Sequence, residues 1–223
     1  MLDVARVLVI ANALAKVNEN TNNWRLPNPS AFADDEIVVI REWVRAGGSL
    51  LLIADHMPFG GAAEKLAIEF GVVFTNGFAT DSSGATGPIR FRRRDGSLGR
   101  HRIMNGRSAR ERIDSVTSFT GQAFRITTGG AVPLMTLHAG STLLLPIVAW
   151  QFSDSTPRIR ADWMLQGAAL QFGRGRVVVL GEAAMLSAQV AGPQRTPMGM
   201  NAPVAPQNAQ FALNIVHWLS RVY

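Results

Sequence analysis

The sequence predicts an α/β fold in which helices cover both faces of a largely parallel β-sheet. In the first third of the chain, short apolar segments alternate with helical patterns in the order strand, helix, strand, helix, strand. The apolar segments are almost uninterrupted, as is typical of parallel strands that are buried on both faces. With 223 residues, 47% of them hydrophobic, the chain is long enough for one well-buried core.

Each element of this first part has its own signal. Residues 4–12, "VARVLVIAN", are β-branched and apolar, which indicates a buried strand. A helix is expected from the acidic residues 34–36, whose charge favours a helix N-terminus, to the glycines at 47–48. The following elements are a strand at 49–55, a helix at 60–71 and a strand at 72–74.

The second part is less regular. Around the turn "RDGS" we expect a basic hairpin at 90–102, and further along a hairpin at 164–182 with the turn "GRGR". The remaining expected elements are strands at 131–138 and 141–150, a helix at 183–189, a long loop at 192–207 and a final helix that buries Phe211, Leu213, Ile215, Trp218 and Leu219. No repeat or linker divides the chain, so residues 1–223 are expected to form a single domain.

Composition excludes several classes of protein. The chain has no cysteine, which removes disulfides, thiolate metal ligands and cysteine nucleophiles. No apolar run reaches the ~18 residues that a membrane span needs, and the first residues lack the features of a signal peptide. We therefore expect a soluble protein of unknown compartment. Since the chain opens almost directly on a core strand, either a short version of the fold suffices or an N-terminal portion is missing. An exposed edge strand would favour a homodimer.

The formal charge of +6 is concentrated in Arg90–Arg102, "RFRRRDGSLGRHR". One interpretation is a patch for phosphate or another anion, and the other is a solvated hairpin. Apart from Phe91, no aromatic residue accompanies the arginines, so nucleic-acid binding by base stacking is not expected.

Four long segments resemble a group of uncharacterised bacterial proteins with a class I glutamine amidotransferase-like domain. The segments are "VLVIANAL", "AFADDEIVVIREWVRAGGSLLLIADHMPFGGAAEKLAIEFGV", "RHRIMNGRSARERIDSVTSFTGQAF" and "GRGRVVVLGEAAMLSAQ" with "GMNAPVAPQNAQFALNIVHWL". The resemblance covers nearly all of residues 1–223. It implies a flavodoxin-like, three-layer α/β/α sandwich with a mostly parallel sheet, to which a β-hairpin region is added, and an extra strand and helix before residue 4.

The resemblance also implies that residues 49–55 form the strand before the amidotransferase nucleophile elbow. Glutaminases of that class need a cysteine at the elbow and a later histidine and glutamate. Here the elbow is Ala54-Asp55-His56 and the chain has no cysteine, which excludes glutamine hydrolysis through a thioester.

Polar side chains follow three of the expected strands: Asn12, the pair Asp55 and His56, and Glu182. Ligands of open parallel sheets bind outside the carboxyl ends of the strands, where these residues are expected to converge. A carboxylate from Asp55 or Glu182 would orient the imidazole of His56 as a general acid or base. The amides of Gly60 and Gly61, at the start of the following helix, would hold an oxyanion or phosphate.

A purely structural interpretation stays open for the same residues, because Asp55 and Glu182 are also suitable caps for the helices that follow them. The three ionisable groups would suit a divalent ion, but no H-x-H or H-x-x-x-H spacing supports this, and we predict no metal and no cofactor. His101 is either a further pocket residue or a surface histidine among arginines. Asn201, in "PMGMNAP", is a candidate for a loop that closes over a ligand.

Two functions remain open. The first is a small-molecule hydrolase that uses His56 as acid or base, supported by Asp55 or Glu182, on an ester, glycoside or amide. The second is a non-catalytic ligand-binding or assembly module of the same fold.

Overall fold

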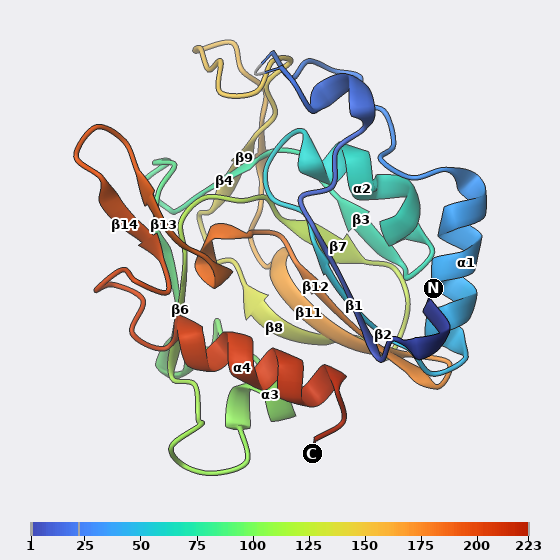
Figure 1. Ribbon diagram of the computed structural model, residues 1–223. Coiled ribbons are helices and arrows are strands. Elements are labelled where there is room, and N and C mark those ends of the chain that lie inside the picture. The colour runs from blue at the N-terminus through green and yellow to red at the C-terminus, as the bar shows by residue number, and fades with distance from the viewer. Residues whose placement is uncertain (1, 22, 223) are drawn as a thin grey trace.

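The computed structural model describes residues 2–21 and 23–222 (Figure 1). Its largest unit is a seven-stranded sheet in the order β1-β2-β12-β11-β7-β3, with β8 also paired to β11. The bounds of these strands are Val7–Ala11 for β1, Ser49–Ile53 for β2, Gly175–Leu180 for β12, Leu165–Phe172 for β11, Phe124–Ile126 for β7, Val72–Phe74 for β3 and Val132–Thr136 for β8.

Parallel pairing in this sheet is limited to β1, β2 and β12, with Leu51 of β2 opposite both Val9 and Val178. The other pairings of the sheet are antiparallel. The remaining strands form three small antiparallel sheets: β10 (Arg158–Arg160), β9 (Thr142–Leu144) and β4 (Phe78–Thr80); β13 (Ala188–Ala191) and β14 (Thr196–Gly199); β5 (Ile89–Arg92) and β6 (Ser115–Ser118).

The predicted flavodoxin-like, three-layer α/β/α sandwich with a mostly parallel sheet is therefore wrong. The described residues form 14 strands in mixed and antiparallel sheets and only four α-helices. Parallel strands need long crossovers, usually helical, and the strand–helix alternation stops after β3. From there to residue 207 the strands are joined by turns and irregular segments, interrupted only by the one-turn helix α3 (Arg102–Asn105), and short connections favour antiparallel pairs.

Helices α1 (Asp34–Arg45) and α2 (Phe59–Ile68) cover one face of the large sheet. The start of α1 is fixed by Glu36, whose Oε2 accepts a 2.9 Å hydrogen bond from the N–H of Ala33. Three residues of α1 at helical spacing then pack on the β2 side chains of that face, together with residues of α2. They are Ile37, Ile40 and Val44.

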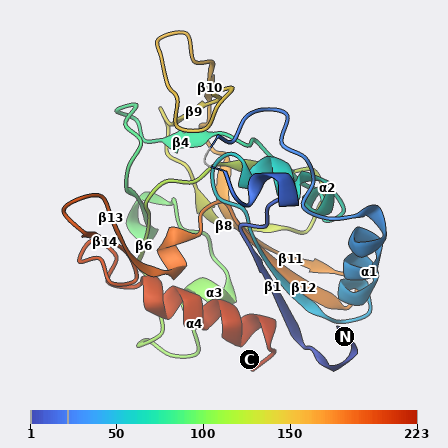
Figure 2. The ribbon, with the colours of Figure 1, turned by 45° about the horizontal axis from the view of Figure 1, so that its top comes forward.

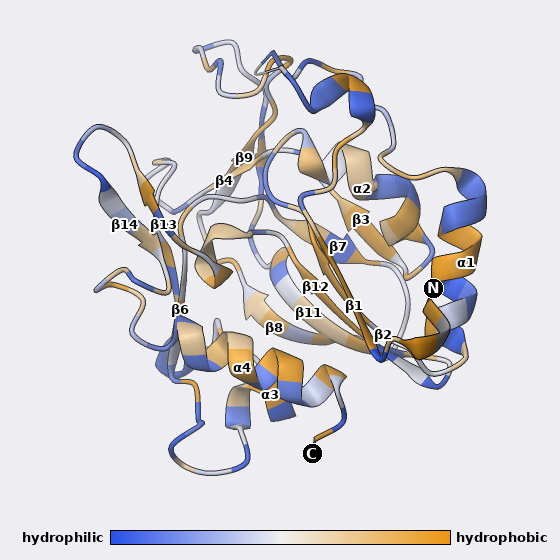
Figure 3. Cartoon of the chain, viewed as in Figure 1, coloured by the Kyte–Doolittle hydropathy of each residue, from blue (hydrophilic) through white to orange (hydrophobic). Residues whose placement is uncertain are grey.

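Helix α4 (Asn208–Leu219) covers the opposite face of the sheet, as the tilted view of Figure 2 shows. Phe211, Ile215 and Trp218 of α4 pack on the alternate β2 side chains Leu51 and Ile53. The sheet is thus buried on both faces at β2, and Figure 3 shows the apolar colouring of the central strands. Short 3-10 turns lie at Leu2–Val4, Lys16–Asn18, Arg93–Asp95 and Ala184–Leu186.

Several local expectations are confirmed, among them α1, α2, α4 and the hairpin of β11 and β12. Within α4, however, Leu213 is exposed, so its expected burial is wrong. The basic hairpin at 90–102 is wrong, because β5 pairs with β6 and the turn at Gly96 leads into α3. The helix at 183–189 is also wrong: one 3-10 turn precedes β13, and part of the expected loop at 192–207 is β14. In the described parts of the chain, every helix is too short or too polar to cross a bilayer.

Candidate functional site

Asp55 and Glu182 lie close together because β2 and β12 are parallel neighbours that end side by side. The Oδ2 atom of Asp55 accepts a 3.2 Å hydrogen bond from the N–H of Ala183, the residue after Glu182. The charge of Asp55 is also near enough to affect the titration of Glu182. The structure thus brings the two predicted carboxyl groups to one edge of the sheet.

Glu182 is fully buried, and its carboxylate is bonded to the main chain. Its two oxygens accept 2.8 Å hydrogen bonds from the N–H groups of Ala184 and Met185, so the side chain caps the 3-10 turn that follows β12. Burial, and secondarily the charge of Asp55, raises the pKa of Glu182 well above the usual value of 4.5, while the backbone hydrogen bonds oppose the shift. A proton therefore binds this buried carboxyl group more readily than it binds one in water.

His56 is buried in an aromatic environment. Its Nδ1 lies 2.7 Å from the carbonyl oxygen of Met57, which assigns the proton to Nδ1 as the donor. The ring stacks on Phe78 at 4.6 Å between centroids and meets the edge of Trp150 at the same distance. Asp55 bonds the main chain of His56, because its Oδ1 accepts a 2.7 Å bond from the backbone N–H and not from the ring.

The predicted ligand-binding residues at this edge are also bonded within the chain. Asn12 has a positive φ of 50°, and its Oδ1 accepts the N–H of Asp55 at 3.0 Å. At the start of α2, the N–H of Gly61 donates to Oδ1 of Asn76 at 2.8 Å. A Cβ added at Gly60 would lie 2.4 Å from Nε2 of Gln122, so this glycine permits close packing. The start of α2 is thus filled by side chains of the same chain.

Gln122 is the residue at this edge that sequence reasoning missed. It is fully buried, and its Nε2 donates at 2.9 Å to the carbonyls of both Ala54 and Asp55. Its Oε1 accepts the N–H of Asn76 at 2.7 Å, and its own N–H donates to the carbonyl of Gly181. One side chain therefore joins the end of β2 to the β3–β4 connection. Its polar character between a glycine and an alanine in "TGQAF" was the available signal.

His101 and Asn201 lie away from these residues. His101 caps α3, accepts the N–H of Ile103 at 3.2 Å and meets the edge of Trp218 on α4. Burial, followed by the charges of two nearby arginines, lowers the pKa of His101 to about 4. Asn201 donates to the carbonyls of Ala188 and Gln189, which attaches its loop to β13.

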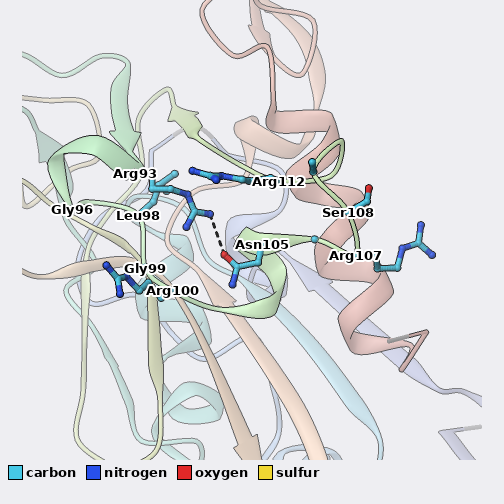
Figure 4. A pocket seen from close by; sticks show the side chains of 11 residues that line it. Arg93, Gly96, Leu98, Gly99, Arg100, Asn105, Arg107, Ser108 and Arg112 are labelled. Carbon is cyan, nitrogen blue, oxygen red and sulfur yellow. Dashed lines mark hydrogen bonds between the residues drawn. The ribbon is translucent and has the colours of Figure 1, made fainter.

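Asp55, His56 and Glu182 line none of five well-formed cavities among the described residues. The largest, about 820 Å³, lies in the arginine-rich segment (Figure 4). No cluster of three or more His, Asp or Glu side chains in residues 2–21 and 23–222 has an arrangement that would hold a metal ion. Asp55, His56, Gln122 and Glu182 therefore form a packed, polar cluster at the strand ends, which we call the strand-end joint. In it, the carboxyl groups of Asp55 and Glu182 hold turns of the main chain.

No model of a known protein family matches the chain, and no curated protein matches it. Several solved structures are similar to this chain in fold. The mmIFT52 N-terminal domain is 14% identical with a TM-score of 0.60, covering 98% of this chain and 79% of that one. Two cytoplasmic proteins of Salmonella typhimurium, STM1381 and STM3548, each have a TM-score of 0.51 at 15% and 14% identity. They cover 96% and 97% of this chain, and 71% and 72% of their own.

At these identities the similarity shows the fold alone. The expected flavodoxin-like α/β hydrolase is wrong in its fold, and neither the strand-rich architecture nor the similarity to the IFT52 domain supports a hydrolase. The resemblance to class I glutamine amidotransferase-like proteins stays a prediction.

Proposed function

We propose that this chain is a non-catalytic assembly module. The observation that carries the proposal is the bonding of the strand-end residues Asp55, His56 and Glu182. The side-chain hydrogen bonds described for these three residues all go to main-chain groups, most of them of residues 56, 57 and 183–185. A general base needs a lone pair directed at a substrate and an orienting partner on its other nitrogen. The ring of His56 is buried against Phe78 and Trp150, and its hydrogen bond goes to a backbone carbonyl and not to Asp55 or Glu182, whose carboxyl groups hold turns of the main chain.

The experiment that distinguishes a structural role of these residues from a catalytic one compares His56→Ala with wild type on a panel of chromogenic ester, glycoside and amide substrates. We expect no turnover above buffer with either protein, and a lower thermal midpoint for the variant, because its aromatic contacts are lost. Turnover by wild type that disappears in a folded His56→Ala protein would refute the proposal. It would favour the hydrolase hypothesis.

In the described residues β1 is the last strand of its sheet, and its outer edge is the assembly surface of this proposal. The carbonyl of Arg6 accepts a hydrogen bond from the N–H of Ser49, and the N–H of Asn12 donates to the carbonyl of Ile53. The main-chain groups of residues 6 and 12 therefore face β2. Neighbouring residues of a strand direct their main-chain groups to opposite sides. The N–H and C=O groups of residues 7, 9 and 11 therefore point away from the sheet, and Val9 is 55% exposed.

These outward groups are symmetric about Val9, which is the centre of the strand Val7–Ala11. In a twofold pairing of two copies, Val9 would lie opposite Val9 of the second copy, and residue 7 opposite residue 11. Such an antiparallel pair would use all three outward residues of each copy. An apolar groove of about 400 Å³ lies beside the edge and would be covered by the second copy; its apolar lining is Leu2, Leu8, Ile10, Phe32, Val39 and Ile40.

The test is the molar mass in solution, measured by light scattering, for wild type, Val9→Pro and Val9→Thr. Proline at position 9 removes an outward N–H and leaves the β1–β2 hydrogen bonds in place, because edge strands tolerate proline on their free side. We expect dimers of wild type and Val9→Thr, and a folded monomer of Val9→Pro. A monomeric wild type at high protein concentration, or a dimeric Val9→Pro protein, would show that the edge is not the assembly surface.

A further inference from the structure

The entire net charge of the protein resides in residues 89–114. This segment contains nine arginines and three carboxylates, a formal charge of +6, which equals that of the whole chain. The rest of the chain is therefore neutral overall. The segment comprises β5, the turn at Gly96, α3 and the connection to β6. Outside it, 13 basic residues are balanced in number by 13 carboxylates.

This charge surrounds two cavities that share a wall. The larger has a volume of about 820 Å³ and is lined by four arginines, by the amide of Asn105 and by small residues (Figure 4). The second, of about 530 Å³, is lined by five arginines and Asp114. Arg93 and Arg112 line both cavities, which makes the two spaces one continuous basic surface.

Arg93 is held in place by neutral partners. Its guanidinium donates to the carbonyls of Met104 at 2.8 Å and Ile113 at 3.0 Å, and to Oδ1 of Asn105 at 3.3 Å. Carbonyl groups fix the side chain without cancelling its charge. Arg93 is thus a preorganised cation in the wall between the cavities.

The carboxylates of the segment neutralise only part of the charge. Asp114 lies between Arg93 at 3.4 Å and Arg112 at 3.0 Å, one negative charge for two positive ones. Glu111 pairs with Arg107, which lowers the pKa of Glu111 to about 2. Figure 4 shows Arg107 extended away from Arg93, whereas Arg112 lies beside it. An excess of positive charge remains at the shared wall and at Arg100.

We propose that this surface binds a small molecule that carries two or more phosphate groups. Arginine presents a planar fork of donors that matches phosphate oxygens, and the chain contains 20 arginines against two lysines. The joined cavities place these forks around spaces large enough for a small ligand. Among the residues that the structure describes, no aromatic side chain lines either cavity, so a ligand recognised by base stacking is disfavoured.

The test is isothermal titration calorimetry with tripolyphosphate as the probe, at low and at high NaCl. The variants are Arg100→Gln and Arg112→Gln; Arg158→Gln, an exposed arginine on β10, is the matched control with the same change of net charge. Arg93 is left intact, because its removal would free the half-buried carbonyl groups of Met104 and Ile113. A charge-assisted hydrogen bond to phosphate contributes about 1.5–3 kcal/mol, so we expect each cavity variant to weaken binding at least about tenfold.

The control and wild type should bind equally, and salt should weaken both. A decline that is equal in Arg158→Gln and in the cavity variants would overturn the proposal, because only net charge would then matter. Absence of binding to wild type at low salt would also overturn it. The second arm uses a single-stranded thymidine decamer: tighter binding of the decamer than of tripolyphosphate would assign the surface to nucleic acid instead.

Discussion

The joint at the strand ends depends on Gln122, and the substitution Gln122→Met tests this directly. Methionine keeps most of the volume of glutamine but cannot make its hydrogen bonds. The change removes the donor to the carbonyls of Ala54 and Asp55 and the acceptor for the N–H of Asn76. Because Gln122 is fully buried, water cannot readily replace the lost partners.

The expected loss of stability follows from counting these groups. Leaving one buried donor or acceptor unsatisfied costs about 1–3 kcal/mol. Three groups lose their partner here, and the lower end of the range applies where the structure relaxes. We therefore expect Gln122→Met to lower the free energy of unfolding by about 3–5 kcal/mol. That is a large fraction of the ~5–15 kcal/mol of a typical domain.

The assay is equilibrium unfolding in urea, followed by tryptophan fluorescence and by far-UV circular dichroism. Gln151→Met is the matched control, because Gln151 is exposed, and its effect should stay within about 0.5 kcal/mol. If Gln122→Met costs less than about 1 kcal/mol, the three hydrogen bonds do not stabilise the joint, and the reasoning fails.

Three further predictions concern neighbouring or buried groups. Gly60→Ala should cost about 2–4 kcal/mol, because its Cβ would displace Gln122, and should be clearly non-additive with Gln122→Met; Gly87→Ala, with open space around it, is the control, and additive losses would contradict the contact. His101 has its pKa lowered to about 4, so it contributes stability above pH 6.5 that is lost as pH falls toward 4. His101→Asn, which keeps the cap, should flatten this dependence by about 1–2 kcal/mol, discounted for partial exposure, and an unchanged acid slope would refute it. Glu182 has a raised pKa, so its contribution is present below pH 4.5 and decreases as pH rises; the stability of Glu182→Gln relative to wild type should therefore increase above pH 4.5, and parallel curves would argue against the shift.

Local patterns in the sequence predicted the elements around the parallel strands well. The apolar run of β2, the acidic start of α1 and the glycine turn between β11 and β12 are all short-range signals. Each of these signals depends on residues that are close together in the sequence, so it can be recognised without knowing the fold.

Which strands pair with one another could not be predicted from such short-range patterns. β3 was expected to extend a parallel sheet, but it lies antiparallel to β7, about fifty residues away in the sequence. β5 likewise pairs with β6 across an intervening helix and turn. Such partners are chosen by packing of the whole core, and a strand of three or four residues has little pattern of its own to specify them.

At the candidate site, the positions of the polar residues in the sequence were informative, but their hydrogen-bond partners were not predictable. That Asp55 and Glu182 each follow a buried strand was predictable, because both strands are strongly apolar and end in polar residues. Their bonding was not, since a carboxylate after a strand suits a cap and a catalytic group equally well. The deciding partners are main-chain N–H groups, and every residue type except proline offers one.

The concentration of charge described for residues 89–114 also affects how the molecule moves toward its partners. A neutral body with +6 at one side has a large electric dipole, which tends to align the molecule in the field of an approaching anion. Encounters with polyanions should then begin with the basic face in front, before any specific contact forms. Because dissolved salt screens this field, the alignment should weaken as the ionic strength of the solution rises.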